Sequence, residues 1–460
     1  MPSRPGLSVS ACLRLGLFQA CLGALAVIFA GLLNRVMLSE LAFPGLLVGG
    51  ALAFEQFVAP ARVLFGQVSD AHPIAARHRV PYVLIGTALF CLLAVASIPL
   101  IFHVGRLLAV GDQPVLGLGI AALCGLFALY GLAISLATTP YLALVIDRTE
   151  EAERPRAVGI IWCMLTVGIV IGAIAISVSL RSLDGVVDPQ VLEPTLRRFM
   201  AVVATLVMAL TLIATWGMEV PGPLAASQAG REDAVTLAQS WALITSSRQV
   251  LVFFSFLVMF TLGLFLQDPV LESYAAQVFA MPIAATTQLN AFWGIGTLLG
   301  LLLAGLWIVP RLGKLPTARL GCRLIVVSLI LLLLCGLAPN VPVLKFVMFC
   351  FGLAAGIATN STLCLMLDLT LPQAAGTFVG VWGLAQAISR AMGKLCGGAL
   401  YDLGRWLHFG SEAYAPFALV LAVETLVAVL ALVLLNRVNV HQFREDTGRS
   451  LSKVMAMELG

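Results

Sequence analysis

The chain alternates long apolar segments with short polar connections along nearly its whole length. Each apolar segment is long enough to cross the roughly 30 Å hydrocarbon core of a bilayer as a helix that rises about 1.5 Å per residue. Within a membrane each segment must satisfy its own backbone polar groups, which favours helices. The pattern predicts an all-α polytopic membrane protein with twelve transmembrane helices, at about 12–34, 42–66, 80–104, 114–146, 156–182, 194–217, 248–272, 285–309, 317–337, 341–368, 374–401 and 412–436.

The longest polar stretch separates the sixth predicted helix from the seventh. It covers about 218–247 and contains Pro221 and Pro223. Such a stretch suits a linker between two halves. We therefore predict an N-terminal six-helix bundle at 1–217, a cytoplasmic linker at 218–247, a C-terminal six-helix bundle at 248–436 and a cytoplasmic tail at 437–460.

A repeat relates the two predicted bundles. An alignment without gaps joins ALVIDRTEEAERPRAVGIIW, with Asp147 and Gly159, to CLMLDLTLPQAAGTFVGVWG, with Asp368 and Gly380. In each half this stretch ends the fourth predicted helix and begins the fifth. The match is expected for two duplicated six-helix bundles.

Composition supports a membrane protein and excludes other classes. Of the 460 residues 60% are hydrophobic and 11% are charged, whereas soluble domains carry roughly 25% charged residues. The net charge of +4 is small for this length, so we expect no nucleic-acid partner. No nucleophile–base pair, metal cluster or phosphate-binding loop stands in a suitable context, so we expect neither an enzyme nor a protein metal site.

Basic residues beside the predicted helices indicate the orientation. Connections rich in Lys and Arg stay in the cytoplasm. With twelve crossings, most of the 27 Lys and Arg residues lie on the side that carries both ends of the chain. We therefore expect both termini in the cytoplasm.

The connection after the second predicted helix reads APARVLFGQVSDAHPIAARHRVPY and combines a glycine, an acid and basic residues. Gly66 would let two helices approach closely, and Asp70 could pair with a basic residue. The pattern resembles the loop signature of the major facilitator transporters, in which such a cluster would lock one gate between the bundles. A solvated loop that only satisfies the charge bias is the alternative. The candidate gate residues are Gly66, Ser69, Asp70, His72, Arg77, Arg79, Asp147 and Arg156.

Ionisable side chains inside the predicted helices form a second group of candidates. They are Glu55, Gln56 and Arg62 in the second helix, Arg390 and Lys394 in the eleventh, and Glu424 in the twelfth. A charge deep in the bilayer costs about 2.5 kcal/mol or more, so each one needs a partner or a function. Arg390 and Lys394 lie one turn apart on one helix face, which suits an anionic ligand or a carboxylate such as Glu55 or Glu424. An interior salt bridge that holds the bundles in register is the alternative.

A third group lies near the non-cytoplasmic ends of the first and seventh predicted helices. It consists of Asn34, Arg35 and Glu40 after the first and Gln267, Asp268 and Glu272 at the end of the seventh. Because these two helices correspond in a two-repeat transporter, the two sets could face each other across the pseudo-twofold axis. Interfacial anchoring and helix capping are the alternative reading.

Three segments together resemble one family. They are LNRVMLSELAFPG from Leu33, APARVLFGQVSDAHPIAARHRVPY from Ala59 and LQDPVLESYAAQVFAM from Leu266. In this order they are similar to the PucC/LhaA family, the bacteriochlorophyll-delivery branch of the major facilitators. The chain departs from that family in the third segment, where Ala275 and Ala276 replace paired glycines and Gln277 replaces an acid. The matching positions are Asn34, Arg35, Glu40, Arg62, Gly66, Ser69, Asp70, His72, Arg79, Gln267, Asp268, Glu272 and Tyr274.

The resemblance implies a factor that assembles light-harvesting complexes in an inner, intracytoplasmic or thylakoid membrane. It would handle or deliver (bacterio)chlorophyll, or shield nascent antenna polypeptides. The implied partners are (bacterio)chlorophyll or a precursor, antenna polypeptides and membrane lipid. A secondary transporter of a small solute, with or without ion coupling, is the alternative, because fold alone does not separate the two.

A bound (bacterio)chlorophyll would need an axial ligand for its magnesium. None of the five histidines lies in the middle of a predicted helix. Magnesium accepts oxygen donors, so the candidate ligands are Asn34, Glu40, Glu55, Gln56, Gln267 and Glu272. With Arg35, Arg62, Asp268, Tyr274, Arg390 and Lys394 they make up the predicted cargo-binding set.

Overall fold

The computed structural model describes residues 8–110, 113–149, 154–181, 188–219, 248–368, 375–407 and 413–439, and every named element within them is a helix. The first half contains α1 (Val9–Val27), the π-helices η1 (Ile28–Leu33) and η2 (Val36–Glu40), α2 (Gly45–Phe57), α3 (Ala61–Ala71), α4 (Val80–Val110), α5 (Gln113–Arg148), α6 (Arg154–Ser179) and α7 (Pro189–Thr215). The second half contains α9 (Arg248–Phe265), α10 (Leu271–Phe279), α11 (Ile283–Thr286), α12 (Gln288–Leu303), the π-helix η4 (Ala304–Ile308), α13 (Val309–Leu312), α14 (Lys314–Cys335), α15 (Val341–Asp368), α16 (Ala375–Leu407) and α17 (Ala415–Asn436).

Each of the twelve predicted apolar segments contains a helix. Within the described residues, eight helical stretches are long and apolar enough to cross a membrane. Shorter apolar helices at Gly45–Phe57, Cys163–Ser179 and Leu251–Phe265 lie in the second, fifth and seventh predicted segments. The eleventh segment is α16, which carries Arg390 and Lys394. The chain is therefore an integral membrane protein of about twelve transmembrane helices.

Prolines interrupt two of the predicted segments. In 42–66, α2 ends at Phe57 and α3 begins directly after Pro60. In 248–272, Pro269 lies in the connection between α9 and α10. Proline lacks the backbone N–H that a helix interior needs, and it disfavours helical backbone at the preceding residue.

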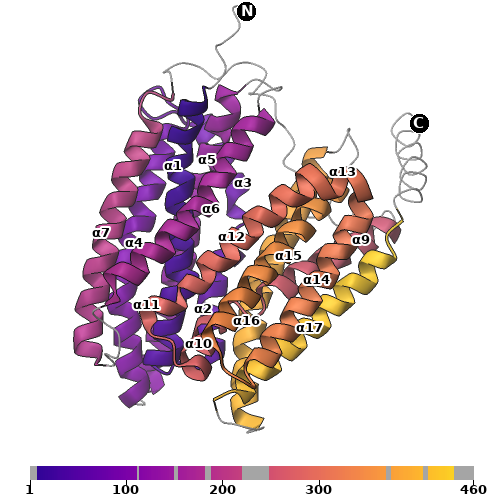
Figure 1. Ribbon diagram of the computed structural model, residues 1–460. Coiled ribbons are helices and arrows are strands. Elements are labelled where there is room, and N and C mark those ends of the chain that lie inside the picture. Colours follow the sequence, from indigo (N-terminus) through magenta and orange to yellow (C-terminus); the bar gives the residue numbers. More distant parts are fainter. Residues whose placement is uncertain are drawn as a thin grey trace, which may run out of the picture.

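The helices pack as two groups that lie side by side (Figure 1). In the first half α1 packs on α6 and α7, α4 on α5 and α7, and both α2 and α3 on α5. In the second half α15 packs on α12 and α14, while α17 packs on α9, α14 and α16. The two halves meet mainly where α2 contacts α16 and where α6 contacts α12. The predicted linker, 218–247, lies almost entirely outside the described residues.

Figure 1 shows α1 beginning at the upper end of the molecule and α10 and α11 at the lower end. Hydrogen bonds near the upper end join the first and last helices of each half. Arg14 Nη2 donates to the Trp216 carbonyl at 2.8 Å, and the Asn439 N–H donates to Gln249 Oε1 at 3.0 Å.

Glycines bring α2 and α16 into backbone contact toward the lower end. A Cβ atom at Gly49 would collide with the Lys394 carbonyl oxygen, and one at Gly398 would collide with the Gly45 carbonyl oxygen. Next to this crossing, Asp402 of α16 accepts hydrogen bonds from the backbone N–H groups of Gly45 (2.6 Å) and Leu46 (2.7 Å). These groups have no partner within their own helix, so an acid from the second half caps a helix of the first.

A second carboxylate caps α4 at the upper end. Glu219, which follows α7, accepts hydrogen bonds from the backbone N–H groups of His78 (2.6 Å), Arg79 (2.9 Å) and Val80 (2.6 Å). The helix dipole adds a favourable interaction with the negative charge. Glu219 thus fixes the position of the α3–α4 connection against α7.

We expect Glu219→Ala to lower the free energy of unfolding by about 1–2 kcal/mol, because three backbone donors lose their acceptor. Thermal unfolding of the detergent-solubilised protein measures the loss. Glu193→Ala is the matched control, since Glu193 pairs at 2.9 Å with Arg106, whose side chain is 59% exposed, and exposed pairs contribute about 0–1 kcal/mol. Equal losses in the two variants would contradict a capping role for Glu219.

Candidate functional site

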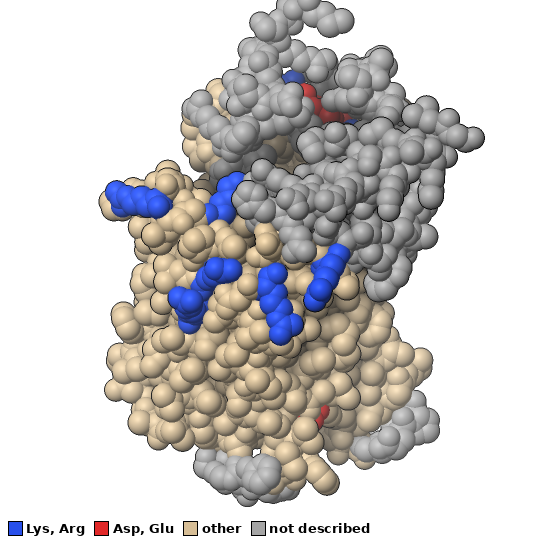
Figure 2. Space-filling model, turned by 90° about the vertical axis from the view of Figure 1, so that its right-hand side faces the viewer, with Lys and Arg blue, Asp and Glu red and all other residues tan. Residues whose placement is uncertain are grey.

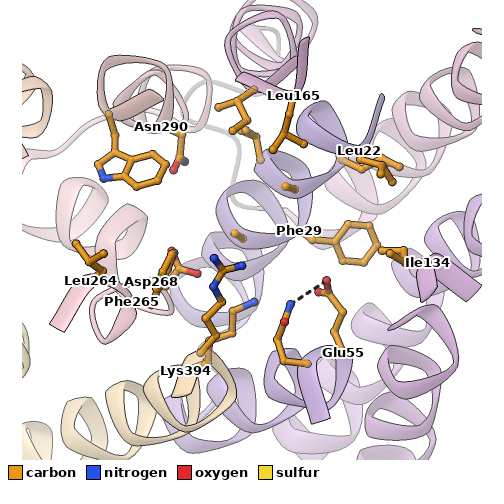
Figure 3. A pocket seen from close by; sticks show the side chains of 18 of the residues that line it. Leu22, Phe29, Glu55, Ile134, Leu165, Leu264, Phe265, Asp268, Asn290 and Lys394 are labelled. Atoms are coloured by element: carbon orange, nitrogen blue, oxygen red, sulfur yellow. Dashed lines mark hydrogen bonds between the residues drawn. The ribbon is translucent and has the colours of Figure 1, made fainter. Parts of the chain in front are cut away.

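A cavity of about 600 Å³ lies between the two halves (Figure 3). Ligand pockets in proteins commonly measure about 300–1,000 Å³. Most of its wall is apolar and comes from both halves, including Leu22, Phe29, Ile134, Leu165, Leu264 and Trp293. The polar residues that line it are Gln19, Glu55, Gln56, Tyr130, Thr138, Thr139, Gln267, Asp268, Asn290, Arg390 and Lys394.

The wall from the first half combines aromatic rings with one carboxylate. The rings of Phe29 in η1 and Tyr130 in α5 are stacked, with centroids 4.1 Å apart and planes 20° apart. Glu55 and Gln56 come from the last turn of α2, and Gln56 Nε2 donates to Glu55 Oε1 at 3.3 Å. The chain breaks at Pro60 directly after this turn, so these polar groups sit at the end of a helix and not in its middle.

The wall from the second half carries two cations. Arg390 and Lys394 lie one turn apart on α16, and the Arg390 guanidinium carbon lies 4.7 Å from the centre of the Phe265 ring. Asp268, between α9 and α10, interacts electrostatically with both cations. Figure 3 shows Lys394 and Glu55 pointing toward the same space from opposite helices. The sequence suggested Glu55 or Glu424 as a partner carboxylate. Glu55 lines the same cavity as the two cations, and Asp268 is a further carboxylate beside them.

Glu424 lies behind the cavity wall. Its side chain is fully buried and is not part of the cavity lining. Its Oε1 accepts a hydrogen bond from the Gln267 backbone N–H at 3.4 Å, and the Gln267 side-chain amide is oriented to donate to the same carboxylate. Glu424 therefore positions Gln267, which does line the cavity.

Below the cavity, Asn34 and Arg35 of the first span reach across to the second half. They lie between the π-helices η1 and η2. Asn34 Nδ2 donates to the Asp268 carbonyl at 2.9 Å. Arg35 Nη1 donates to the Met281 carbonyl at 3.0 Å and to Thr286 Oγ1 at 2.9 Å. These bonds join the halves at the lower end.

Glu272 in α10 is the anionic partner in this layer. It is 2% exposed and accepts hydrogen bonds from Asn290 Nδ2 at 2.6 Å and Thr286 Oγ1 at 3.3 Å. It also interacts electrostatically with Arg35. The polar groups of the first and seventh spans thus meet across the two halves, as the sequence suggested.

Five described members of the predicted cargo-binding set do not line the cavity: Asn34, Arg35 and Glu272 in the layer below it, and Glu40 and Tyr274. Glu40 pairs with Arg35 of its own half at 3.3 Å and does not line the cavity. The Tyr274 hydroxyl donates to the Leu332 carbonyl at 2.9 Å inside the second half. Sequence reasoning missed Thr286 and Asn290, which lie one turn apart where the eighth segment begins. Uncharged polar side chains are common at helix starts, where they act as caps, so their residue types alone do not mark a site.

The candidate gate residues form a cluster at the upper end of the first half. Arg79 Nη1 donates to Ser69 Oγ at 2.8 Å, and Arg79 Nε pairs with Asp147 Oδ2 at 3.0 Å. Ser69 Oγ in turn donates to the Gly66 carbonyl at 2.9 Å. The cluster therefore joins α3, the start of α4 and the end of α5.

The other predicted gate residues either have exposed side chains or have side chains outside the described part of the structure. The side chains of His72 and Arg77 are exposed, and the His72 carbonyl accepts a hydrogen bond from the Tyr82 hydroxyl at 2.6 Å. The side chains of Arg62, Asp70 and Arg156 lie outside the described part of the structure.

Comparison with known proteins places the chain within one family, over most of its length. The family described as "PUCC protein" matches residues 32–443. The chain is 30% identical to "Protein PucC" of Rhodovulum sulfidophilum over 90% of each chain. It is also 30% identical to "Bacteriochlorophyll synthase 44.5 kDa chain" of Rhodobacter capsulatus, over 91% of this chain and 92% of that protein.

Solved structures of transporters share the fold. A bacterial homologue of the iron transporter ferroportin in its inward-facing state superposes with a TM-score of 0.68 at 14% identity, covering 94% of this chain and 99% of that one. The nucleoside transporter NupG gives a TM-score of 0.64 at 14% identity, covering 96% and 99%. At this identity the likeness concerns the fold alone, and it confirms the predicted major-facilitator architecture.

Proposed function

The chain belongs to the PUCC protein family, and from this premise we propose that it is an assembly factor for light-harvesting complexes. In this proposal it handles (bacterio)chlorophyll and delivers the pigment to nascent antenna polypeptides, or shields those polypeptides, in a photosynthetic membrane. It catalyses no reaction. Its partners are the pigment or a precursor, the antenna polypeptides and the surrounding lipid.

The observation that carries the proposal is the large, mostly apolar cavity between the two halves of a membrane protein. A flat pigment ring could pack against the stacked Phe29 and Tyr130 and against Trp293. Glu55, Gln56 and Asn290 supply oxygen atoms in the same space. Such atoms are suitable ligands for the magnesium of the pigment, and a carrier that must release its cargo is served by such ligands rather than by a tight metal site.

The distribution of cations supports an orientation with the upper end in the cytoplasm. Arg248, Arg311, Arg323 and Arg437 are exposed on the upper part of the second half. Figure 2 shows Lys and Arg side chains gathered toward the upper end of that face. Because basic residues beside the spans stay in the cytoplasm, both ends of the chain would lie there, in an inner, intracytoplasmic or thylakoid membrane.

We expect protein purified in mild detergent from a pigment-producing host to carry sub-stoichiometric (bacterio)chlorophyll, visible in its absorption spectrum. Leu165→Trp, which fills part of the cavity, should remove at least half of that pigment, because the added ring takes up space the cargo needs. Ile171→Trp is the matched control on the same helix, since Ile171 is 56% exposed and does not line the cavity. A spectrum without any tetrapyrrole in the unmodified protein would count against pigment handling.

A deletion strain separates this function from transport of a small solute. Loss of antenna complexes with normal pigment synthesis supports assembly. Uptake of a soluble metabolite by the reconstituted protein, with normal antenna complexes in the deletion strain, supports transport instead. Antenna polypeptides that co-purify without pigment would indicate shielding rather than delivery.

A further inference from the structure

Asn290 belongs both to the cavity and to the polar layer that joins the halves beneath it. It lies in the first turn of α12 and lines the cavity, and Figure 3 shows it on the wall that comes from the second half. Its Nδ2 donates a hydrogen bond to Glu272 Oε1 at 2.6 Å. Glu272 is 2% exposed and is not part of the cavity lining. One side chain therefore contacts both the space for the cargo and the buried carboxylate below it.

Glu272 connects Asn290 to the first half of the molecule. The Thr286 hydroxyl donates to Glu272 Oε2 at 3.3 Å and accepts a hydrogen bond from Arg35 Nη1 at 2.9 Å. The backbone of η1 also lies against this group, because a Cβ atom at Gly31 would collide with Glu272 Oε1 and lie 3.1 Å from Asn290 Nδ2. A displacement of the Asn290 side chain would therefore be felt by two parts of the first span.

Asp268 also lines the cavity and bonds to the first span, but in a different way. Asn34 donates to its backbone carbonyl at 2.9 Å, so that bond does not use the side chain that faces the cavity. In Asn290 one amide group serves both sides. Its Nδ2 is engaged by Glu272, and within the described residues its Oδ1 accepts no hydrogen bond, so the oxygen can bind a cargo.

We propose that Asn290 couples occupancy of the cavity to closure of the lower end. This rests on the proposed function, because the cargo is a pigment whose magnesium binds the Asn290 amide oxygen. Withdrawal of electron density from that oxygen strengthens the hydrogen bond that the same amide donates to Glu272. A bound cargo also orders the side chain in advance, which lowers the entropy cost of closing the layer around it.

Coupling of this kind is reciprocal. A pigment that favours the closed lower end must bind the closed form more tightly than the open form. The effect is measurable only where the closed form is not already dominant. Gly49→Ala supplies such a background, because its added Cβ atom would collide with the Lys394 carbonyl oxygen at the crossing of α2 and α16.

The first test measures closure with and without cargo. Ser39→Cys and Gln277→Cys, whose parent side chains lie 3.3 Å apart across the halves, are combined with Gly49→Ala in the full-length protein in lipid nanodiscs. Disulfide formation between positions 39 and 277 is followed in the dark by peptide mass spectrometry. Saturating bacteriochlorophyll a should raise its initial rate at least about 5-fold.

Pigment binding is monitored in the same samples by quenching of tryptophan fluorescence, since Trp293 lines the cavity. A rate that bound pigment leaves unchanged or lowers would overturn the coupling and leave pigment handling intact. Absence of quenching at any pigment concentration would overturn the proposed function itself.

The second test reverses the direction. The same protein is titrated with bacteriochlorophyll a before and after the disulfide between positions 39 and 277 has formed. The oxidised, closed protein should bind the pigment at least about 5-fold more tightly, and reduction of the disulfide should restore the weaker affinity. Equal affinities of the two forms would refute the coupling.

A variant assigns the coupling to Asn290. In Asn290→Leu, in the same background, saturating pigment should change the rate of disulfide formation by less than about 2-fold while quenching still reports bound pigment. The ratio of rates with and without pigment is the readout, because a loss of closure from a purely structural cause lowers both rates and cancels. A ratio as large as that of the parent protein would show that another residue carries the coupling.

Thr297→Val is the matched control for Asn290→Leu. Thr297 lies on the same helix, is not part of the cavity lining, and donates its hydroxyl to the Trp293 carbonyl of its own helix at 2.8 Å. We expect the pigment to accelerate disulfide formation in this variant as it does in the parent protein. Loss of the acceleration in Thr297→Val as well would contradict the specific role of Asn290.

Discussion

Arg35→Gln is expected to lower the free energy of unfolding by about 3–5 kcal/mol, the usual cost of removing one partner from a buried charge cluster. Arg35 is 6% exposed and reaches Met281 and Thr286 across the interface between the halves. Without the guanidinium, the buried Glu272 carboxylate loses the cation that faces it. Unfolding in detergent and the yield of antenna complexes in cells should fall together.

A double-mutant cycle tests whether the loss of stability comes from the unpaired charge on Glu272 or from the changed shape of the side chain at position 35. Glu272→Gln in the Arg35→Gln background should recover part of the lost stability, because the remaining side chain no longer carries an unpaired charge. Arg106→Gln is the control, since it removes an exposed pair that contributes about 0–1 kcal/mol. Additive losses from Arg35→Gln and Glu272→Gln would show that the two side chains do not depend on each other.

Gly49→Ala is expected to hold the lower end open. Alanine normally stabilises a helix by about 0.5–1 kcal/mol relative to glycine, but here its Cβ atom would collide with the Lys394 carbonyl oxygen. The cysteine pair Ser39→Cys and Gln277→Cys reports closure, because these side chains lie 3.3 Å apart across the halves. The equilibrium constant between the closed and open forms should fall about 10-fold if the contact costs about 1.4 kcal/mol, and the initial rate of cross-linking should fall with the population of the closed form.

Gly50→Ala is the matched control for this change. It lies one residue further along α2, where a Cβ atom would lie 3.5 Å from Leu395 Cδ1, an ordinary contact. Cross-linking should therefore stay at the level of the parent protein. A Gly49→Ala protein that cross-links as well as the Gly50→Ala protein would contradict the role given to the backbone contact.

Hydrophobic patterning was sufficient to locate the helices, because a transmembrane helix needs a long apolar run whatever its neighbours are. The same patterning did not anticipate the ends of α2 and α9, although Pro60 and Pro269 were visible signals. In each case the apolar run continues through the proline, so the predicted segment extends past the residue where the helix ends.

Pairing across the halves was harder to infer from sequence. Asp268 interacts electrostatically with Arg390 and Lys394, and nothing in the spacing of these residues along the chain singles it out beside Glu55 and Glu424. Asp402 was missed altogether, since it caps α2 from 357 positions away along the chain. Contacts of this kind depend on how two separately folded bundles dock, which a linear pattern does not encode.

Because the first span contains π-helical stretches, the number of residues in it matters as much as which residues they are. Each residue turns a helix by about 100°, so the extra residues that widen η1 and η2 set the direction in which Asn34 and Arg35 emerge. Removing any single residue between Ile28 and Asn34 would rotate both side chains away from Asp268 and Thr286 with every polar group still present. Relatives whose halves are joined by the same hydrogen bonds should therefore align through this segment without insertions or deletions, even where its apolar residues differ.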